Sequence, residues 1–385
     1  MPASGVVSCL RAGPIVLRFP IRFPALPRMK KCLVIELWWL GDATLMTSAL
    51  RGLLEDGWEV TVLAKPQTHA FLEPVYPQIG WIEFEAPWTA LYGKYKLWRW
   101  PWGEIFRVLR ELRARRFDAS LSIRWDPREH FLLWLAGIRR RIGFKTPWSL
   151  WFLNEPISGH NPRLHRVEDW WEVQRHLDPS TATCLPPRLT ADPALTERFR
   201  ASFRRDPRSV LAIHCGARIA LRRWPVAYFR ELISHLRREF DFQLALFPDL
   251  DGYGNELQDL ADHVFTGLNT AEMLAALDGV AHLICNDSGP SHLADALGVP
   301  VIAIFGPGNP EKLRPFHRDN LVVIRDTCPY HPCSDYCRFP EPYCMTQLTP
   351  SLVWSEIHDN LLARGRIPRL ASSSFHDSGE AGTKT

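Results

Sequence analysis

Two consecutive series of alternating strand-like and helix-like segments dominate the chain. The first series begins with an apolar run at residues 32–37 and a helical pattern at 43–54. The second begins with a strand pattern at 209–214 and a helical pattern at 225–238. Alternation of this kind predicts parallel sheets that are covered by helices on both faces. Between the two series, residues 178–193 contain Asp-Pro and Pro-Pro steps without periodicity, which indicates a linker.

The same patterns continue within each series. Further strands are predicted at 58–64, 81–85, 118–123, 242–247, 282–285 and 299–305, and further helices at 104–116, 129–136, 271–277, 290–297 and 352–363.

The chain has 385 residues, a length that suits two domains. We therefore predict an α/β fold with two Rossmann-like domains, at 29–180 and 181–350, followed by a C-terminal helical segment at 351–370. Their parallel sheets would face each other across a cleft. Open sheets of this kind bind ligands at the carboxyl ends of their strands.

The two ends of the chain lack these patterns. Residues 1–28 are rich in Pro, are interrupted by Arg and contain no clean apolar segment, so they make a poor signal peptide. We predict that they are disordered or a mis-annotated extension, with translation starting at Met29. Residues 371–385 are predicted to form a disordered tail.

Charge is distributed unevenly along the chain. The net charge of +4 gives no reason to expect nucleic-acid binding. No uncharged apolar run approaches the ~18–20 residues of a membrane span, so we expect a cytoplasmic protein. Between residues 94 and 145, however, fourteen Lys and Arg residues occur against five Asp and Glu residues, which suggests an anionic partner.

Tryptophans accompany the cations in this basic segment. Trp98, Arg99 and Trp100 lie at its beginning, and Trp beside Arg suits peripheral contact with a membrane surface or with the phosphorylated sugar of a lipid. A loop packed on the core of the first domain is the alternative interpretation.

Asp42 follows the first predicted strand, in the stretch WWLGD at 38–42. The strand-to-helix turn lies at the edge of the sheet that faces the cleft. An Asp at that place can act as a general base that takes a proton from an attacking hydroxyl group. It can equally act as an N-cap for the first helical turn. The spacing does not separate these two interpretations.

Two further polar turns follow strands of the second series. The stretch NDSGPSH at 286–292 leads into a helix at Pro290, and the helix start with Ser288 and Gly289 forms a ready anion pocket. After the strand at 209–214, Arg218, Arg222 and Arg223 supply cations for a diphosphate. An ordinary capped turn and a solvated basic loop are the alternatives.

These stretches resemble glycosyltransferase family 9, the ADP-heptose:lipopolysaccharide heptosyltransferases. The resemblance runs from about residue 31 to 362, and LGD (40–42), WP (224–225), NDSGPSHLA (286–294), ALGVP (296–300) and FGP (305–307) carry it. It implies a GT-B fold and an inverting mechanism that requires no metal or other cofactor. It also implies an ADP-sugar donor, most plainly ADP-heptose, and a lipopolysaccharide-core or related glycan acceptor.

The resemblance implies roles for individual residues as well. Asp42 takes the place of the catalytic base. Asp287, Ser288, Gly289 and His292 fall on the donor-diphosphate motif. Arg222 stands where the family usually has Lys. The positive charge is kept, but it is spread over a planar guanidinium group with several N–H donors. Leu268 matches a residue that packs on the base of the donor, and Glu256 matches one that contacts the ribose.

Two other functions fit the same fold. One is a nucleotide-sugar 2-epimerase, which needs additional acid and base carboxylates that the sequence does not convincingly offer. The other is a non-catalytic protein that binds a nucleotide sugar, and the presence of Asp42 argues against it.

Four cysteines gather near the end of the second domain: Cys328, Cys333, Cys337 and Cys344. Four thiols in a short loop can close a tetrahedral zinc site. Their spacing, however, is not that of paired Cys-x-x-Cys motifs, and free thiols are the favoured interpretation. Asp249 and Asp251 imitate the Asp-x-Asp metal motif of the other large glycosyltransferase fold, but we interpret that stretch as a loop.

Overall fold

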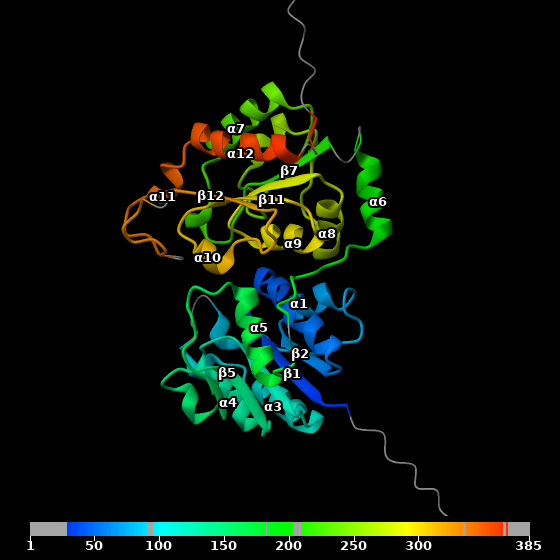
Figure 1. Ribbon diagram of the computed structural model, residues 1–385, viewed down its shortest axis with the longest axis vertical. Coiled ribbons are helices and arrows are strands. Elements are labelled where there is room, and N and C mark those ends of the chain that lie inside the picture. Colours follow the sequence, from blue (N-terminus) through cyan, green and yellow to red (C-terminus); the bar gives the residue numbers. More distant parts are fainter. Residues whose placement is uncertain are drawn as a thin grey trace, which may run out of the picture.

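The computed structural model describes residues 29–90, 95–181, 183–203, 206, 209–325, 327–333, 336–364 and 367–368. The predictions for residues 1–28 and 371–385 lie outside the described residues. The described chain forms two units, one above the other in Figure 1, and each is built around a six-stranded parallel sheet. The predicted fold class, α/β with two Rossmann-like units, is confirmed.

The first unit has the strand order β3-β2-β1-β4-β5-β6. Its strands are β1 (Lys31–Glu36), β2 (Glu59–Ala64), β3 (Gly80–Glu83), β4 (Ala119–Ser122), β5 (Arg140–Phe144) and β6 (Glu155–Ile157). Its helices are α1 (Leu40–Glu55), α2 (Pro66–Leu72), α3 (Trp102–Arg115), α4 (Pro127–Leu135) and α5 (Arg166–Leu177). The strand order changes direction between β1 and β4, and open α/β sheets bind ligands at such a switch point.

The second unit repeats this topology, with the order β12-β11-β10-β7-β8-β9. Its strands are β7 (Val210–His214), β8 (Gln243–Phe247), β9 (His263–Val264), β10 (His282–Asn286), β11 (Val301–Phe305) and β12 (Leu321–Ile324). Its helices are α6 (Pro193–Ser202), α7 (Val226–Glu239), α8 (Thr270–Asp278), α9 (Gly289–Leu297), α10 (Pro310–Leu313), α11 (Tyr343–Thr346) and α12 (Pro350–Arg364). The switch point lies here between β7 and β10.

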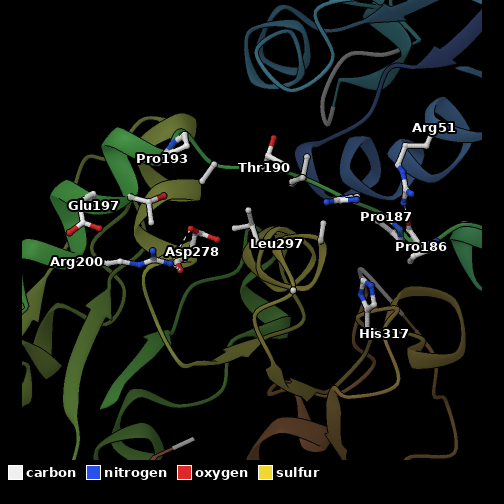
Figure 2. A pocket seen from close by; sticks show the side chains of 16 residues that line it. Arg51, Pro186, Pro187, Thr190, Pro193, Glu197, Arg200, Asp278, Leu297 and His317 are labelled. Carbon is white, nitrogen blue, oxygen red and sulfur yellow. Dashed lines mark hydrogen bonds and ion pairs between the residues drawn. The ribbon is translucent and has the colours of Figure 1, made fainter. Parts of the chain in front are cut away.

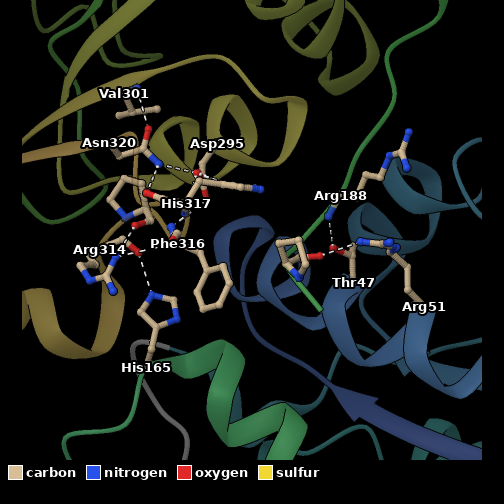
Figure 3. Close-up of polar contacts among 12 residues, drawn as sticks. Thr47, Arg51, His165, Arg188, Asp295, Val301, Arg314, Phe316, His317 and Asn320 are labelled. Atoms are coloured by element: carbon tan, nitrogen blue, oxygen red, sulfur yellow. Dashed lines mark hydrogen bonds and ion pairs between the residues drawn. The ribbon is translucent and has the colours of Figure 1, made fainter. Parts of the chain in front are cut away.

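The linker between the units is hydrogen-bonded to both of them. The backbone N–H of Arg188 donates to Oγ1 of Thr47 in α1, at 3.1 Å (Figure 3). The N–H of the next residue, Leu189, donates to the carbonyl oxygen of Ala296 in α9, at 2.9 Å. The side chain of Asp192 caps α6, where regular structure resumes.

Helices α1 and α9 pack against each other where the units meet. One apolar cluster therefore runs through both units and includes Met46 and Leu50 of α1 together with Leu293 of α9. The last helix, α12, packs on α7 and β12 of the second unit. None of the helices in the described part of the chain combines the length and apolar character that a bilayer span requires.

Candidate active site

The starts of α1 and α9 face each other across the interface between the units. A Cβ atom added to Gly41 would lie 3.0 Å from Cδ2 of His292 and 3.6 Å from Cα of Gly289. The glycine thus lets the first turn of α1 approach α9 closely. Because β1 leads into α1 and β10 leads into α9, the polar stretches at 38–42 and 286–292 come together here.

Asp42 lies in the first turn of α1, but it is not the N-cap. That position belongs to Trp39, which makes no side-chain capping bond. Oδ1 of Asp42 lies 2.6 Å from Nη2 of Arg124 and 3.9 Å from Nε of Arg166. The Asp42 side chain keeps 22% of its surface exposed. Its carboxylate is thus held by two cations while part of the side chain stays exposed.

Three carboxyl groups around Arg124 differ in charge. Burial raises the pKa of Asp42, but Arg124 and Arg166 together outweigh it and bring the pKa below its usual value. Burial raises the pKa of Glu36 to about 7, although Nη2 of Arg124 lies 3.7 Å from its Oε1. Burial also raises the pKa of Glu129 to about 8. Near neutral pH, Asp42 is therefore ionised while Glu129 holds a proton.

The sequence patterns did not reveal Arg124, Arg166, Glu36 or Glu129. Arg124 follows β4, the neighbour of β1 across the switch point, so the strand order would have pointed to it. Arg166 is the first residue of α5, a helix that was not predicted. Glu36 is the last residue of β1 and interrupts an otherwise apolar strand.

The second unit contributes an ion pair and a helix start. Nη1 of Arg222 lies 3.2 Å from Oδ2 of Asp287, which is buried at the end of β10. Ser288 is the N-cap of α9 and makes no side-chain capping bond. Among the described residues, no heavy atom lies within 4 Å of a Cβ built on Gly289, so there is open space at the helix start. This arrangement suits an anion.

His292 lies in the first turns of α9, behind this helix start. Burial lowers its pKa, so the imidazole is neutral near pH 7. Its Nδ1 atom is buried and has no hydrogen-bond partner within the described residues. A buried polar atom without a partner is costly, and a ligand in the cleft could satisfy it.

The remaining basic residues of the 214–225 loop have different surroundings. The guanidinium group of Arg218 stacks on Trp39 of the first unit, 4.2 Å from the ring centroid. Arg223 instead forms ion pairs with Asp249 at 3.0 Å and with Asp251 at 2.7 Å. Both carboxylates of the Asp-x-Asp stretch therefore pair with Arg223 in a loop after β8.

Trp224 and Asn286 hold the edge of the second sheet. Trp224 is fully buried, and its Nε1 donates to the carbonyl oxygen of Leu348 at 2.7 Å. Oδ1 of Asn286 accepts from the backbone N–H of Trp224 at 3.1 Å, and Nδ2 donates to the carbonyl oxygen of Cys215. These bonds tie the ends of β7 and β10 to the start of α7.

The two residues that were matched to the nucleoside lie on loops at the same edge. Glu256 is exposed in the 3₁₀-helix η6 (Asn255–Leu260), after β8. Leu268 is half-buried between β9 and α8 and packs against the apolar cluster. The carboxyl ends of parallel strands meet at one edge, so both loops lie on the side of the sheet that carries α9.

A cavity of about 630 Å³ lies on the first unit, and Asp42 is not among the residues that line it. Its lining includes Trp100, Trp125 and Arg128. Trp125, in the wall of the cavity, directly follows Arg124, the ion-pair partner of Asp42. Trp98 and Arg99, in the 3₁₀-helix η2 (Leu97–Arg99), are exposed and do not line the cavity.

A second cavity, of about 650 Å³, lies along the linker (Figure 2). Arg51 from the later part of α1 and Leu297 at the end of α9 line it. Both helices start at the candidate active site, so this cavity lies behind the interface and away from Asp42.

The four clustered cysteines are free thiols. Burial and the neighbouring thiols raise the pKa of Cys344 to about 11. Within the described residues, no group of three or more His, Cys, Asp and Glu side chains is placed to hold a metal ion.

Two Rossmann-like units whose strand-to-helix turns face each other make up the GT-B fold. The chain belongs to glycosyltransferase family 9 (heptosyltransferase), whose family model matches residues 105–342. The resemblance seen in the sequence motifs is thereby confirmed.

Curated relatives and solved structures agree with this assignment. Lipopolysaccharide heptosyltransferase 2 of Salmonella typhimurium is 25% identical over 360 residues, which is 87% of this chain and 99% of the relative. Lipopolysaccharide heptosyltransferase 1 of Pseudomonas aeruginosa is 28% identical over 166 residues, or 38% of this chain and 47% of the relative. The ADP-heptose lipopolysaccharide heptosyltransferase II structure from Escherichia coli aligns with a TM-score of 0.67 and 21% identity, covering 87% of this chain and 99% of that one.

Proposed function

We propose that this enzyme transfers heptose from ADP-heptose onto a lipopolysaccharide-core or related glycan acceptor, with inversion and without a metal ion. The main support is that the start of α1, which carries Asp42, lies close to the start of α9: a Cβ atom built on Gly41 would be 3.6 Å from Cα of Gly289. A carboxylate base and an anion site thus lie on opposite sides of one cleft. The names of the relatives, lipopolysaccharide heptosyltransferases, support the choice of donor and acceptor.

In the proposed reaction, Asp42 takes the proton of an acceptor hydroxyl group. The hydroxyl oxygen forms a bond to the anomeric carbon from the face opposite the diphosphate, and the bond between that carbon and the diphosphate oxygen breaks. ADP leaves with the bonding electron pair. Arg222 and the amides at the start of α9 stabilise the charge that develops on the diphosphate, an electrostatic contribution of several kcal/mol in comparable sites, roughly 3 per donor.

The other donor contacts are extensions of the same proposal. Asp287 orients Arg222 through their ion pair of 3.2 Å, and His292 offers a buried ring nitrogen toward the diphosphate. Arg218 adds a cation above Trp39. We further propose that Leu268 packs on the adenine and that Glu256 accepts hydrogen bonds from the ribose.

The acceptor is proposed to bind in the cavity of about 630 Å³ whose wall includes Trp125, the residue after Arg124. Trp100 and Trp125 offer ring faces to a sugar, and Arg128 offers a cation to an anionic substituent. Trp98, 78% exposed, and the exposed Arg99 lie next to this cavity in sequence and would contact the inner-membrane surface peripherally.

The general base is tested with Asp42→Ala, using release of ADP from ADP-heptose in the presence of a lipid A–core extract. We expect a loss of turnover of at least about 100-fold, with ADP affinity unchanged within about threefold, because the carboxylate acts on the acceptor hydroxyl. Undiminished turnover would remove Asp42 from the mechanism.

Membrane contact is tested separately, by sedimentation with anionic phospholipid vesicles. Trp98→Ser combined with Arg99→Gln should reduce binding, whereas Leu250→Ser, which changes a 91% exposed side chain of the second unit, should not. Equal binding by both variants would contradict the proposed membrane face.

A further inference from the structure

The first turn of α5 contacts the second unit. Nε2 of His165, the N-cap of α5, lies 2.8 Å from the carbonyl oxygen of Arg314, just after α10 (Figure 3). Nδ1 of the same ring accepts a hydrogen bond from the N–H of Val167 at 3.2 Å, so Nε2 carries the proton and donates. The imidazole ring also lies 5.1 Å from the ring of Phe316. These contacts hold the first turn of α5 against the second unit.

A series of ion pairs starts at this contact and ends at Asp42. Nζ of Lys312 in α10 lies 2.6 Å from Oδ2 of Asp169 in α5. Nη1 of Arg166 lies 3.3 Å from the same oxygen atom. Nε of Arg166 then lies 3.9 Å from Oδ1 of Asp42. Lys312 is the member of this series that belongs to the second unit.

Little water reaches these groups. Asp169 is fully buried, and the side chains of Lys312 and Arg166 are each 15% exposed. Charges interact strongly in such surroundings, because neither solvent nor salt screens them well. Nε of Arg166 is buried and has no hydrogen-bond partner among the described residues. The Nε–H group of Arg166, which is the one nearest to Asp42, can therefore still donate a hydrogen bond.

Asp169 and Asp42 compete for Arg166. Without Lys312, Asp169 would keep, among the described residues, only His160, whose Nε2 lies 3.5 Å from its Oδ1, besides Arg166, and would draw the guanidinium group of Arg166 toward itself and away from Asp42. Lys312 neutralises Asp169 and weakens this attraction, but only while the two units are together. The position of the second unit therefore influences the surroundings of the candidate base.

We propose that Lys312 is a positioning residue, which neutralises Asp169 and thereby leaves Arg166 to hold Asp42 in its reactive orientation. The proposal rests on the proposed role of Asp42 as the base. It goes further by linking that role to α10, which follows the FGP stretch at 305–307 beside the diphosphate site. The base would be correctly held only when the donor-binding unit is in place.

The test compares Lys312→Met, Asp169→Asn and the double variant, all in the full-length chain. Initial rates are measured with ADP-heptose and a lipid A–core extract, and the Kd for ADP is measured by calorimetry. Lys312→Met should lower kcat about tenfold or more, with the Kd for ADP changed less than about twofold. Asp169→Asn removes the competing carboxylate, so its loss should be smaller and the double variant should recover most of the lost kcat.

Lys30→Met is the matched control, because Lys30 is exposed and precedes the opposite end of β1. Thermal unfolding confirms that each variant is folded. A Lys312→Met enzyme with wild-type kcat would overturn the proposal. So would a Kd for ADP that rises in step with the fall in kcat and is not restored in the double variant. A wild-type enzyme without transfer activity would overturn the proposed function as well, which distinguishes the two failures.

Discussion

Arg124→Met removes the cation beside Asp42 while it keeps a side chain of similar length. Nη2 of Arg124 lies 2.6 Å from Oδ1 of Asp42 and 3.7 Å from Oε1 of Glu36, and the Arg124 side chain is only 15% exposed. Removing one partner of a buried ion pair typically costs about 3–5 kcal/mol. Protonation limits this cost, because Asp42 can take up a proton instead of staying charged. The ordinary pKa of an Asp carboxyl group is 3.8. Protonating it at pH 7 therefore costs about 4 kcal/mol, which is the upper limit of the destabilisation.

The same reasoning predicts how the loss depends on pH. In the wild type the pKa of Asp42 is below 3.8, so its stabilising contribution is present above that value and is lost as the pH falls through the lowered pKa. Without Arg124, burial dominates and raises the pKa of Asp42, so the ionised group destabilises the folded state. This penalty fades as the pH falls. We expect a loss of about 3–4 kcal/mol near pH 7 and less than about 2 kcal/mol near pH 5.

Urea unfolding of both proteins at the two pH values measures this difference. Arg107→Met serves as the control, because Arg107 pairs with Glu104 and Glu111 on an exposed face of α3. Pairs of that kind contribute up to about 1 kcal/mol, with little change between the two pH values. A penalty for Arg124→Met that is equal at both pH values would refute the proposed electrostatic role of Arg124.

Three further predictions concern other parts of the site. Glu129→Gln should flatten the pH dependence of stability, because burial raises the pKa of Glu129 from 4.5 to about 8. The contribution of Glu129 to stability is therefore greatest below pH 4.5 and falls by up to roughly 5 kcal/mol as the pH rises toward 8, which urea unfolding of both proteins across this range measures. Gly41→Ala places a Cβ 3.0 Å from Cδ2 of His292 and should lower kcat roughly tenfold by separating α1 from α9, whereas unchanged kinetics would show that this approach is not needed. Turnover should change less than about twofold after treatment with a chelator, and metal analysis of the purified protein would detect zinc bound at the cysteines if this expectation is wrong.

The central strands of both sheets could be predicted from sequence because they are buried on both faces. In β7, β10 and β11 every residue is buried, and each strand reads as an uninterrupted or nearly uninterrupted apolar run. The edge strands β6 and β9 have three and two residues, too few to show any period. They form because a neighbouring strand offers free backbone groups, which is a property of the sheet rather than of the local sequence.

Helix α5 was missed for a different reason. Val167, Trp170, Val173 and Leu177 are buried and recur at helical spacing, so the signal was present. It lies among charged residues and two adjacent tryptophans, which obscure the apolar face. The omission mattered, because α5 carries Arg166 and Asp169.

In the candidate site too, residues at strand ends could be predicted from the local sequence, whereas their partners depend on the order of the strands in the sheet. Asp42 and Ser288 could be located because each lies where a strand leads into a helix, and strand ends gather at one edge of a parallel sheet. The partners of these residues could not be located in this way. Arg124 reaches Asp42 only because β4 lies beside β1, and Arg223 is engaged with Asp249 only because β8 lies beside β7.

The lowered pKa of Asp42 bears on when the proton would move. A carboxylate held by Arg124 and Arg166 is a weak base, too weak to ionise a free hydroxyl group in advance. Once the hydroxyl oxygen begins to bond to the anomeric carbon, however, its proton becomes strongly acidic, and a weak base is then sufficient. Proton transfer would therefore follow bond formation. As Asp42 becomes neutral, Arg124 and Arg166 are left with more positive charge at the moment when negative charge grows on the diphosphate across the cleft. The two arginines weaken Asp42 as a base, but they would stabilise a transition state in which the proton moves late. Their position beside Asp42 is therefore compatible with its proposed role as the base.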